Sequence, residues 1–200
     1  MQNASEFNPN LFAGEVKTEL LSQAVRVFLS NQRQATAKTK TRSEINRTKK
    51  KWFKQKGTGN ARHGARTPSI FVGGGVAHGP TGTQNYTLKL TAKMKKQAML
   101  SALVVQSKIT FVDDAFTKVD GKTKSAIKNL GTILENEKTR VLLVVDQKTP
   151  ELIRSYNNIS QVLLVTARYL NLLHLTNADQ IIISTQGAQA LATRLLGEEK

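Results

Sequence analysis

"RVLLVV", residues 140–145, is a short run of aliphatic residues behind a single arginine. Three more runs of this character lie in the second half of the chain: ITFV at 109–112, QVLLV at 161–165 and QIIIS at 180–184. Branched aliphatic residues without polar alternation are typical of strands covered on both faces of a sheet. We therefore predict four short buried strands.

Helical patterns separate these strands. Residues that repeat at helical spacing, or that resemble a helix cap, are Ile127, Leu130 and Leu134, then Thr149 with Pro150, then Ala188, Leu191 and Leu195. Strands that alternate with helices pair in parallel, because each helix carries the chain back to the starting edge of the sheet. The prediction is an α/β fold: a three-layer α/β/α body with a mainly parallel sheet of about four strands.

The first half of the chain contributes two helices and a long interval between them. Apolar residues at helical spacing predict an amphipathic helix from about 17 to 32 and another around 94–103. From about 35 to 86 neither a helical period nor an alternation is sustained, so this interval has no apolar face of its own to bury. We predict one domain, residues 1–200, with a long extended loop at 35–88.

Basic residues are concentrated in this loop. The formal net charge is +16; the first hundred residues hold 18 lysines and arginines against 4 acids, and the second hundred 12 against 10. From residue 38 to 66 the single acid is Glu44, and the cations are Lys38, Lys40, Arg42, Arg47, Lys49, Lys50, Lys51, Lys54, Lys56, Arg62 and Arg66. Such a protein seeks a polyanion, most simply nucleic acid.

The loop also repels itself, and ordering it is costly. Fixing its backbone costs on the order of 50 kcal/mol, at about 1 kcal/mol or more per residue. A segment with this composition does not recover that free energy internally. We therefore expect a partner outside the chain to order the loop.

Glycines and aromatic residues accompany the cations. Eight of the 13 glycines lie between 57 and 82, and Trp52 with Phe53 sits inside KKKWFKQK. Planar rings stack on unpaired bases, cations meet phosphates, and glycines let the backbone approach closely. The loop is predicted to thread among crowded RNA.

Signatures of catalysis and of metal binding are weak. The chain has no cysteine, which excludes disulfides, thiolate zinc sites and cysteine nucleophiles. GGGVAHG at 73–79 lacks the preceding strand and the lysine spacing of a phosphate-binding loop. His63, His78 and His174 have no partner at ligand spacing, and His174, inside YLNLLHL, is expected to be structural.

Three carboxylates follow strands, where catalytic acids of α/β enzymes occur. They are Asp113, Asp114 and Asp146, and each is equally typical of a turn or a helix cap. No nucleophile or metal cluster accompanies them. We expect no enzymatic activity, no catalytic residue, no metal site and no cofactor.

The N-terminal segment MQNASEFNPNLFAGEVKTELL has neither a signal peptide nor a membrane-spanning pattern. Its first ten residues are polar and irregular, so no order is expected there. We predict a protein of the cytoplasm, or of an organelle interior, with no membrane partner.

Three blocks of the loop carry a family resemblance. KTKTRSEI at 38–45, WFKQKGTGNARHG at 52–64 and GGGVAHGP at 73–80, with the spacing between them, closely resemble the L-four family of large-subunit ribosomal proteins, bacterial or organellar type. QKGTG followed by ARHG is the specific signal. The elements after residue 100, ending in ARYLNLLHLTNADQIIIS, also resemble that family's body.

The resemblance implies a structural constituent of the large ribosomal subunit and a primary binder of its rRNA. It implies neighbouring large-subunit proteins as partners, and a loop that reaches the wall of the peptide exit tunnel, near the nascent peptide and the macrolide site. It implies that Arg62 and His63 continue the RNA contacts beyond the tip. Together with the cations and the tryptophan identified above, the predicted RNA-binding residues are Lys38, Lys40, Arg42, Arg47, Lys49, Lys50, Lys51, Trp52, Lys54, Lys56, Arg62, His63 and Arg66. The implied tunnel-proximal tip is Lys54, Gln55, Lys56, Gly57, Thr58, Gly59 and Asn60.

The chain departs from the family pattern at four positions. Lys51 stands where proline is usual, Asn60 where arginine is usual, and Phe71 with Val72 where tryptophan and arginine are common. The missing cation at residue 60 changes the contacts expected at the tip.

Two alternatives remain open at this point. One is a regulatory RNA-binding protein that acts on its own mRNA or on transcription, which co-sedimentation with large subunits would distinguish. The other is a nucleotide-dependent α/β protein acting on RNA. Failure of ATP or NAD to shift the melting temperature would argue against this second alternative.

Overall fold

The computed structural model describes residues 11–12, 14–106, 108–113, 116, 118–131 and 139–197. Its strands are β1 (Ile109–Val112), β2 (Val141–Val145), β3 (Val162–Thr166) and β4 (Gln180–Ser184). Its helices are α2 (Thr18–Gln32), α3 (Ala92–Val105), α5 (Thr123–Gly131), α6 (Pro150–Tyr156), α7 (Leu172–Asn177) and α8 (Thr185–Leu196), with a 3-10 turn η2 (Ala167–Tyr169).

The four strands form one sheet in the order β1-β4-β2-β3, and every pair is parallel. The predicted α/β class is confirmed, and each strand begins within one residue of its predicted start. The helix α7 was not predicted, because it is only six residues long, fewer than two turns, and so shows no helical period. All five residues of β2 are buried, since this strand has a neighbour on each side and helices on both faces.

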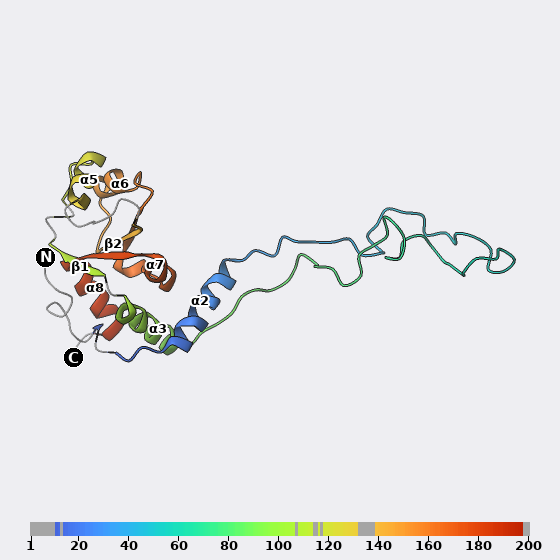
Figure 1. The fold of residues 1–200 in the computed structure, drawn as a ribbon, viewed down its shortest axis with the longest axis horizontal. Coiled ribbons are helices and arrows are strands. Elements are labelled where there is room, and N and C mark those ends of the chain that lie inside the picture. The colour runs from blue at the N-terminus through green and yellow to red at the C-terminus, as the bar shows by residue number, and fades with distance from the viewer. Residues whose placement is uncertain are drawn as a thin grey trace. The chain divides into compact units, whose positions relative to one another are not determined.

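Side chains alternate between the two faces of the sheet, and each face has its own hydrophobic cluster. Leu142, Val144, Ile181 and Ile183 pack in one cluster with residues of α2, α3, α7 and α8. Val141, Leu143, Val145 and Ile182 pack in the other with residues of α5 and α6. Figure 1 shows α5 and α6 on one side of the sheet and α3 and α8 on the other. The body is therefore a three-layer sandwich.

Two predicted local roles are confirmed at helix starts. Thr149 caps α6, where its Oγ1 accepts a hydrogen bond from Leu152 N at 3.3 Å, and Pro150 is the first helical residue. His174 belongs to the capping box of α7: its backbone N–H donates to Asn171 Oδ1 at 2.8 Å, and its Nδ1 accepts from Asn171 N at 3.4 Å. Burial, and then the charge of Lys148, lowers the pKa of His174. The neutral ring is a structural acceptor.

Some sequence predictions fall outside the described residues: Leu134, Asp114 and the first ten residues. The carbonyl of Asp113 accepts a hydrogen bond from Phe116 N at 2.9 Å. Over the described part of the chain, no three His, Cys, Asp or Glu side chains are grouped to hold a metal ion. No helix in that part has the length and apolarity to cross a membrane.

The chain divides into two compact units. Met1–Leu29 with Lys89–Lys200 forms one unit, here the body, and Ser30–Leu88 forms the other, here the loop unit. Both hydrophobic clusters belong to the body. After α2 ends at Gln32, the loop unit contains neither a helix nor a strand, only one isolated β-bridge.

Candidate nucleic-acid interface

The loop unit carries most of the net charge of the chain. Ser30–Leu88 contains twelve lysines and arginines and one glutamate, a formal charge of +11 out of the total of +16. In the interval from residue 38 to 66 every lysine and arginine except Arg47 is exposed. This density of exposed cations matches a phosphate backbone.

Two stretches of the loop unit run antiparallel and pair with each other. Ser30 Oγ donates to Tyr86 O at 2.6 Å, and the Asn31 side chain makes two hydrogen bonds with the backbone of Leu88, at 2.8 and 3.1 Å. Lys38 and Thr81 form the antiparallel bridge. We call residues 30–40 and 80–88 the arms and residues 41–79 the head; the arms fix where the head begins and ends.

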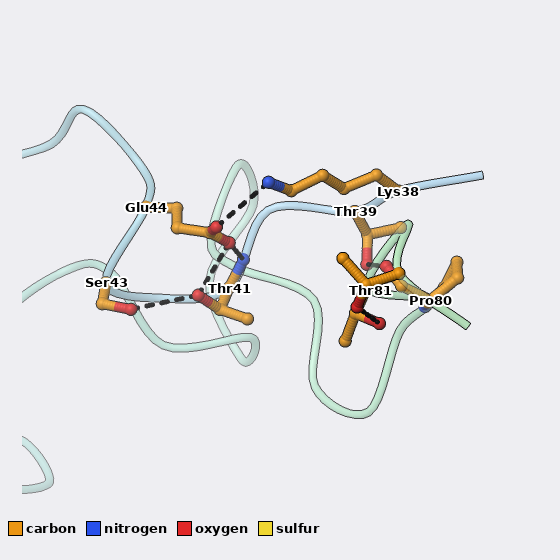
Figure 2. A network of polar contacts seen from close by, with 8 residues as sticks. Lys38, Thr39, Thr41, Ser43, Glu44, Pro80 and Thr81 are labelled. Atoms are coloured by element: carbon orange, nitrogen blue, oxygen red, sulfur yellow. Dashed lines mark hydrogen bonds and ion pairs between the residues drawn. The ribbon is translucent and has the colours of Figure 1, made fainter. Parts of the chain in front are cut away.

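The only acid of the loop unit is held at the junction of arm and head (Figure 2). Glu44 Oε2 accepts from Thr41 N at 2.8 Å and from Thr41 Oγ1 at 2.9 Å, and Oε1 lies 3.5 Å from Lys38 Nζ. The hydrogen bonds from Thr41, and then the charge of Lys38, lower the pKa of Glu44. The carboxylate therefore stays ionised, and it offsets Lys38 rather than the cations of the head.

Four rings pack together inside the head. The ring centroids of Trp52 and Phe71 lie 5.2 Å apart, those of His63 and Phe71 5.1 Å apart, and those of Trp52 and Phe53 5.5 Å apart. The Arg66 guanidinium lies 4.4 Å from the centre of the Trp52 ring, a cation–π distance. The loop was expected to have no apolar face of its own to bury, and this cluster corrects that expectation. Positions 52, 53, 63 and 71 follow no period, so a search for periodic patterns misses them.

Arg47 fastens two parts of the head. Its Nη1 donates to Val72 O at 2.8 Å and to Arg66 O at 3.2 Å, and its side chain is half-buried. A guanidinium bound to two backbone carbonyls has fewer free donors for phosphate. Arg47 was predicted as an RNA ligand from its charge alone, and the structure gives this side chain partners within the protein.

A tight turn at residues 67–75 depends on two glycines. Gly74 N donates to Phe71 O at 2.8 Å, and Gly75 N donates to Thr67 O at 2.8 Å. A Cβ on Gly74 would lie 1.9 Å from Pro68 O, and a Cβ on Gly75 would lie 2.3 Å from the backbone nitrogen of Arg42. No other residue fits at either position without moving the backbone. Here the close approach that glycine permits is to the chain itself.

The tip has the opposite character. All residues from 54 to 60 are exposed. Gly57 and Gly59 adopt φ values of +81° and +66°, in the left-handed region, and nothing lies within 4 Å of a Cβ built on either. Lys51, in the position where the family resemblance predicts proline, donates to Gln55 Oε1. The tip therefore has a defined backbone and exposed side chains.

The predicted site residues thus fall into two groups. Arg47, Trp52, His63 and Arg66 are brought together in the head. The others lie exposed along the loop unit: Lys38, Lys40, Arg42, Lys49, Lys50, Lys51, Lys54, Lys56 and Arg62. Phe71 and the residues of the tight turn were not predicted as part of the site; the signal that pointed to them was the glycine triplet at 73–75.

Comparison with known proteins agrees with the loop and the body together. The family model described as "Ribosomal protein L4/L1 family" matches residues 5–194. The protein named "Large ribosomal subunit protein uL4" of Aquifex aeolicus is 38% identical over 184 residues, which cover 89% of this chain and 90% of that protein. The protein of the same name from Brachyspira hyodysenteriae is 34% identical over 200 residues, covering 96% and 93%. A match of this length extends through both the body and the loop unit, and the chain belongs to the ribosomal protein L4/L1 family.

Proposed function

We propose that this chain is a structural protein of the large ribosomal subunit, and that its loop unit binds the rRNA of that subunit. The carrying observation is the charge of Ser30–Leu88, +11, with nearly all its cations exposed and its single acid bound to Thr41 and Lys38. The names of the matching relatives support the large subunit as the site of assembly. Family membership supports a structural role rather than a catalytic one.

The loop unit acts by neutralising phosphates while its head sets the geometry. Lysines at 49–51, 54 and 56 are exposed, so they are accessible to the phosphates of the RNA. Trp52 keeps 45% of its surface exposed, which leaves part of the ring free to stack on a base. The body provides a folded anchor, and neighbouring ribosomal proteins are its further partners.

Binding to deproteinised large-subunit rRNA is expected to weaken steeply with salt. If about ten phosphates are neutralised, the logarithm of the affinity falls with the logarithm of salt concentration at a slope on the order of −7 to −9. Filter binding between about 50 and 200 mM KCl measures this slope. Changing Lys49, Lys50, Lys51 and Lys54 together to Gln is expected to reduce its magnitude by about three to four. A wild-type slope near zero would contradict the proposal.

We further propose that the tip, residues 54–60, lies at the wall of the peptide exit tunnel and meets the nascent peptide. Two observations support this: every residue of the tip is exposed, and Lys54 and Lys56 come just before Gly57 and Gly59, whose left-handed backbone leaves open space around it. In this proposal Asn60 adds a polar, uncharged group where the family pattern has a cation.

A single cysteine tests the tunnel proposal, because the natural chain has none. Thr58→Cys, labelled with a photo-activated crosslinker in ribosomes that carry a stalled nascent chain, is expected to crosslink to that chain. Thr83→Cys, an exposed threonine in an arm, is the matched control and is expected not to crosslink. Equal crosslinking from both positions, or none from residue 58, would rule out the placement of the tip.

A further inference from the structure

The head contains a hollow on its surface, apart from the ring cluster described above. Its volume is about 520 Å³, and its lining includes Thr41, Arg42, Pro68, Ser69, Val76 and His78. This volume lies in the range of sites that hold small organic ligands, about 300–1,000 Å³. We refer to it as the head hollow.

Backbone contacts fix the walls of the head hollow from both sides. Val76 N donates to Lys40 O at 2.9 Å, and Gly75 N donates to Thr67 O at 2.8 Å. The wall at residues 75–76 is therefore hydrogen-bonded both to the stretch that precedes Thr41 and to the stretch that precedes Pro68. At the other end of the segment a Cβ on Gly79 would lie 2.0 Å from Thr39 Oγ1, so any larger residue there would have to displace the Thr39 side chain. The hollow is therefore built by the fold of the head.

His78 has an unusual backbone for its type. Its φ is +54°, and it is the one non-glycine residue with positive φ among the described residues. Residues 76 and 79 both lie close to the opposite stretch, the chain bends at residues 77 and 78 between them, and His78 lines the hollow from that bend. Conformations of this kind persist where the surroundings impose them, and they cluster at binding sites.

The lining has the chemistry of a nucleotide site. Pro68 and Val76 offer apolar surfaces to the faces of a base, and Ser69 offers a hydroxyl to a base edge. Arg42 is exposed. The only acid of the loop unit, Glu44, is bound to Thr41 and Lys38, so the Arg42 guanidinium is available to bind a phosphate. No acidic residue lines the hollow.

We propose that the head hollow binds one unpaired nucleotide of RNA, with the base between Pro68 and Val76 and its phosphate on Arg42. This inference rests on the proposed function, because the RNA is the one that the loop unit binds. It adds a site at which a nucleotide outside any base pair is held, so that the head recognises a bulge or a loop in addition to the phosphate backbone.

The test makes the same substitution, valine to phenylalanine, at two positions, so neither variant changes the net charge. Val76→Phe fills the hollow. Val72→Phe places the same ring at a position outside the hollow, where the natural valine is 97% exposed. The full-length proteins are titrated with deproteinised large-subunit rRNA at two salt concentrations. Val76→Phe is expected to weaken binding about tenfold or more, as expected for the loss of one stacked base, and to leave the salt slope unchanged. Val72→Phe is expected to match the wild type.

A second pair of variants and a fold reporter keep the outcomes distinct. Trp52 is the single tryptophan of the chain, so an unchanged emission spectrum shows that Val76→Phe keeps the head folded. If the spectrum of Val76→Phe changes, Arg42→Gln is tested in place of Val76→Phe, and Lys40→Gln, another exposed cation of the loop unit, is its control. A greater loss of rRNA affinity for Arg42→Gln than for Lys40→Gln supports the site.

Equal affinities of the test variant and its control overturn the nucleotide site in the head hollow, while the proposed function stands. Weak salt dependence of the wild type overturns the proposed function itself. If Val76→Phe binds rRNA normally but loses a neighbouring ribosomal protein from assembled subunits, the hollow holds a peptide, and the nucleotide site is wrong.

Discussion

Replacing residues 40–79 by a two-residue Asn-Gly turn is expected to remove specific binding to large-subunit rRNA and to leave a folded body. The excision is possible because Thr39 N already donates to Pro80 O at 2.9 Å and Lys38 pairs with Thr81, so the arms present the ends of a hairpin. It removes ten of the thirty lysines and arginines. We expect the affinity to fall on the order of 10³-fold or more at low salt, and the salt slope to approach zero.

The body is expected to melt within about 2–4 °C of the full-length protein, because all residues of both hydrophobic clusters lie outside the loop unit. Calorimetry measures this, and filter binding measures the affinity. A chain in which the order of residues 40–79 is shuffled is the matched control: it keeps every cation, so it retains salt-dependent binding to any RNA but not preference for the large-subunit rRNA. A body that melts far lower would show that the loop unit contributes to the core. A shuffled chain with full specificity would show that the head has no architectural role.

The body was predictable because buried strands leave a direct record in the sequence. The strand β2 is covered on both faces of the sheet, so each residue of VLLVV is buried. The run is therefore continuously aliphatic, and the ends of the strand are easy to locate in the sequence. The start of α6 was predictable for a different reason: a threonine followed by a proline is typical of a helix cap and the first helical residue. The short helix α7 escaped prediction because its six residues make fewer than two turns, which is too few to show a helical period.

The loop unit was predictable in its charge and not in its internal structure. The charge of a segment is the sum over its residues, so the cationic stretch that includes Lys49, Lys50 and Lys51 is found by counting, and the structure shows these lysines exposed. The packing of Trp52 on Phe71, and the hydrogen bonds of Arg47 to two carbonyls, depend on how residues twenty or so positions apart meet, and no local pattern encodes that. A cation that holds the protein together and a cation that binds RNA look alike in the sequence.

Changing Gly74 to Ala is expected to open the head and to weaken rRNA binding without changing the charge. The new Cβ would lie 1.9 Å from Pro68 O and 2.9 Å from Phe71 O, and both neighbours are backbone atoms that cannot rotate away. The turn at 67–75 must therefore widen, which moves Phe71 from its edge-on contact with Trp52. Forced expansion of a packed site costs typically about 1–3 kcal/mol. If binding requires the closed head, this free energy corresponds to an affinity loss of about 5- to 150-fold.

Gly64→Ala is the matched control for this substitution. Gly64 is exposed, has an ordinary φ, and has nothing within 4 Å of an added Cβ. Its carbonyl accepts from Trp52 N at 2.9 Å, a hydrogen bond that alanine keeps. We expect Gly64→Ala to bind as the wild type does, whereas Gly74→Ala shifts the Trp52 emission to longer wavelength and keeps the wild-type salt slope at lower affinity. If both variants bind equally well while the Trp52 emission of Gly74→Ala shifts, the geometry of the head is irrelevant to recognition, and the cations alone account for binding. Because the two proteins differ only in which glycine carries the methyl group, neither net charge nor chain entropy explains a difference between them.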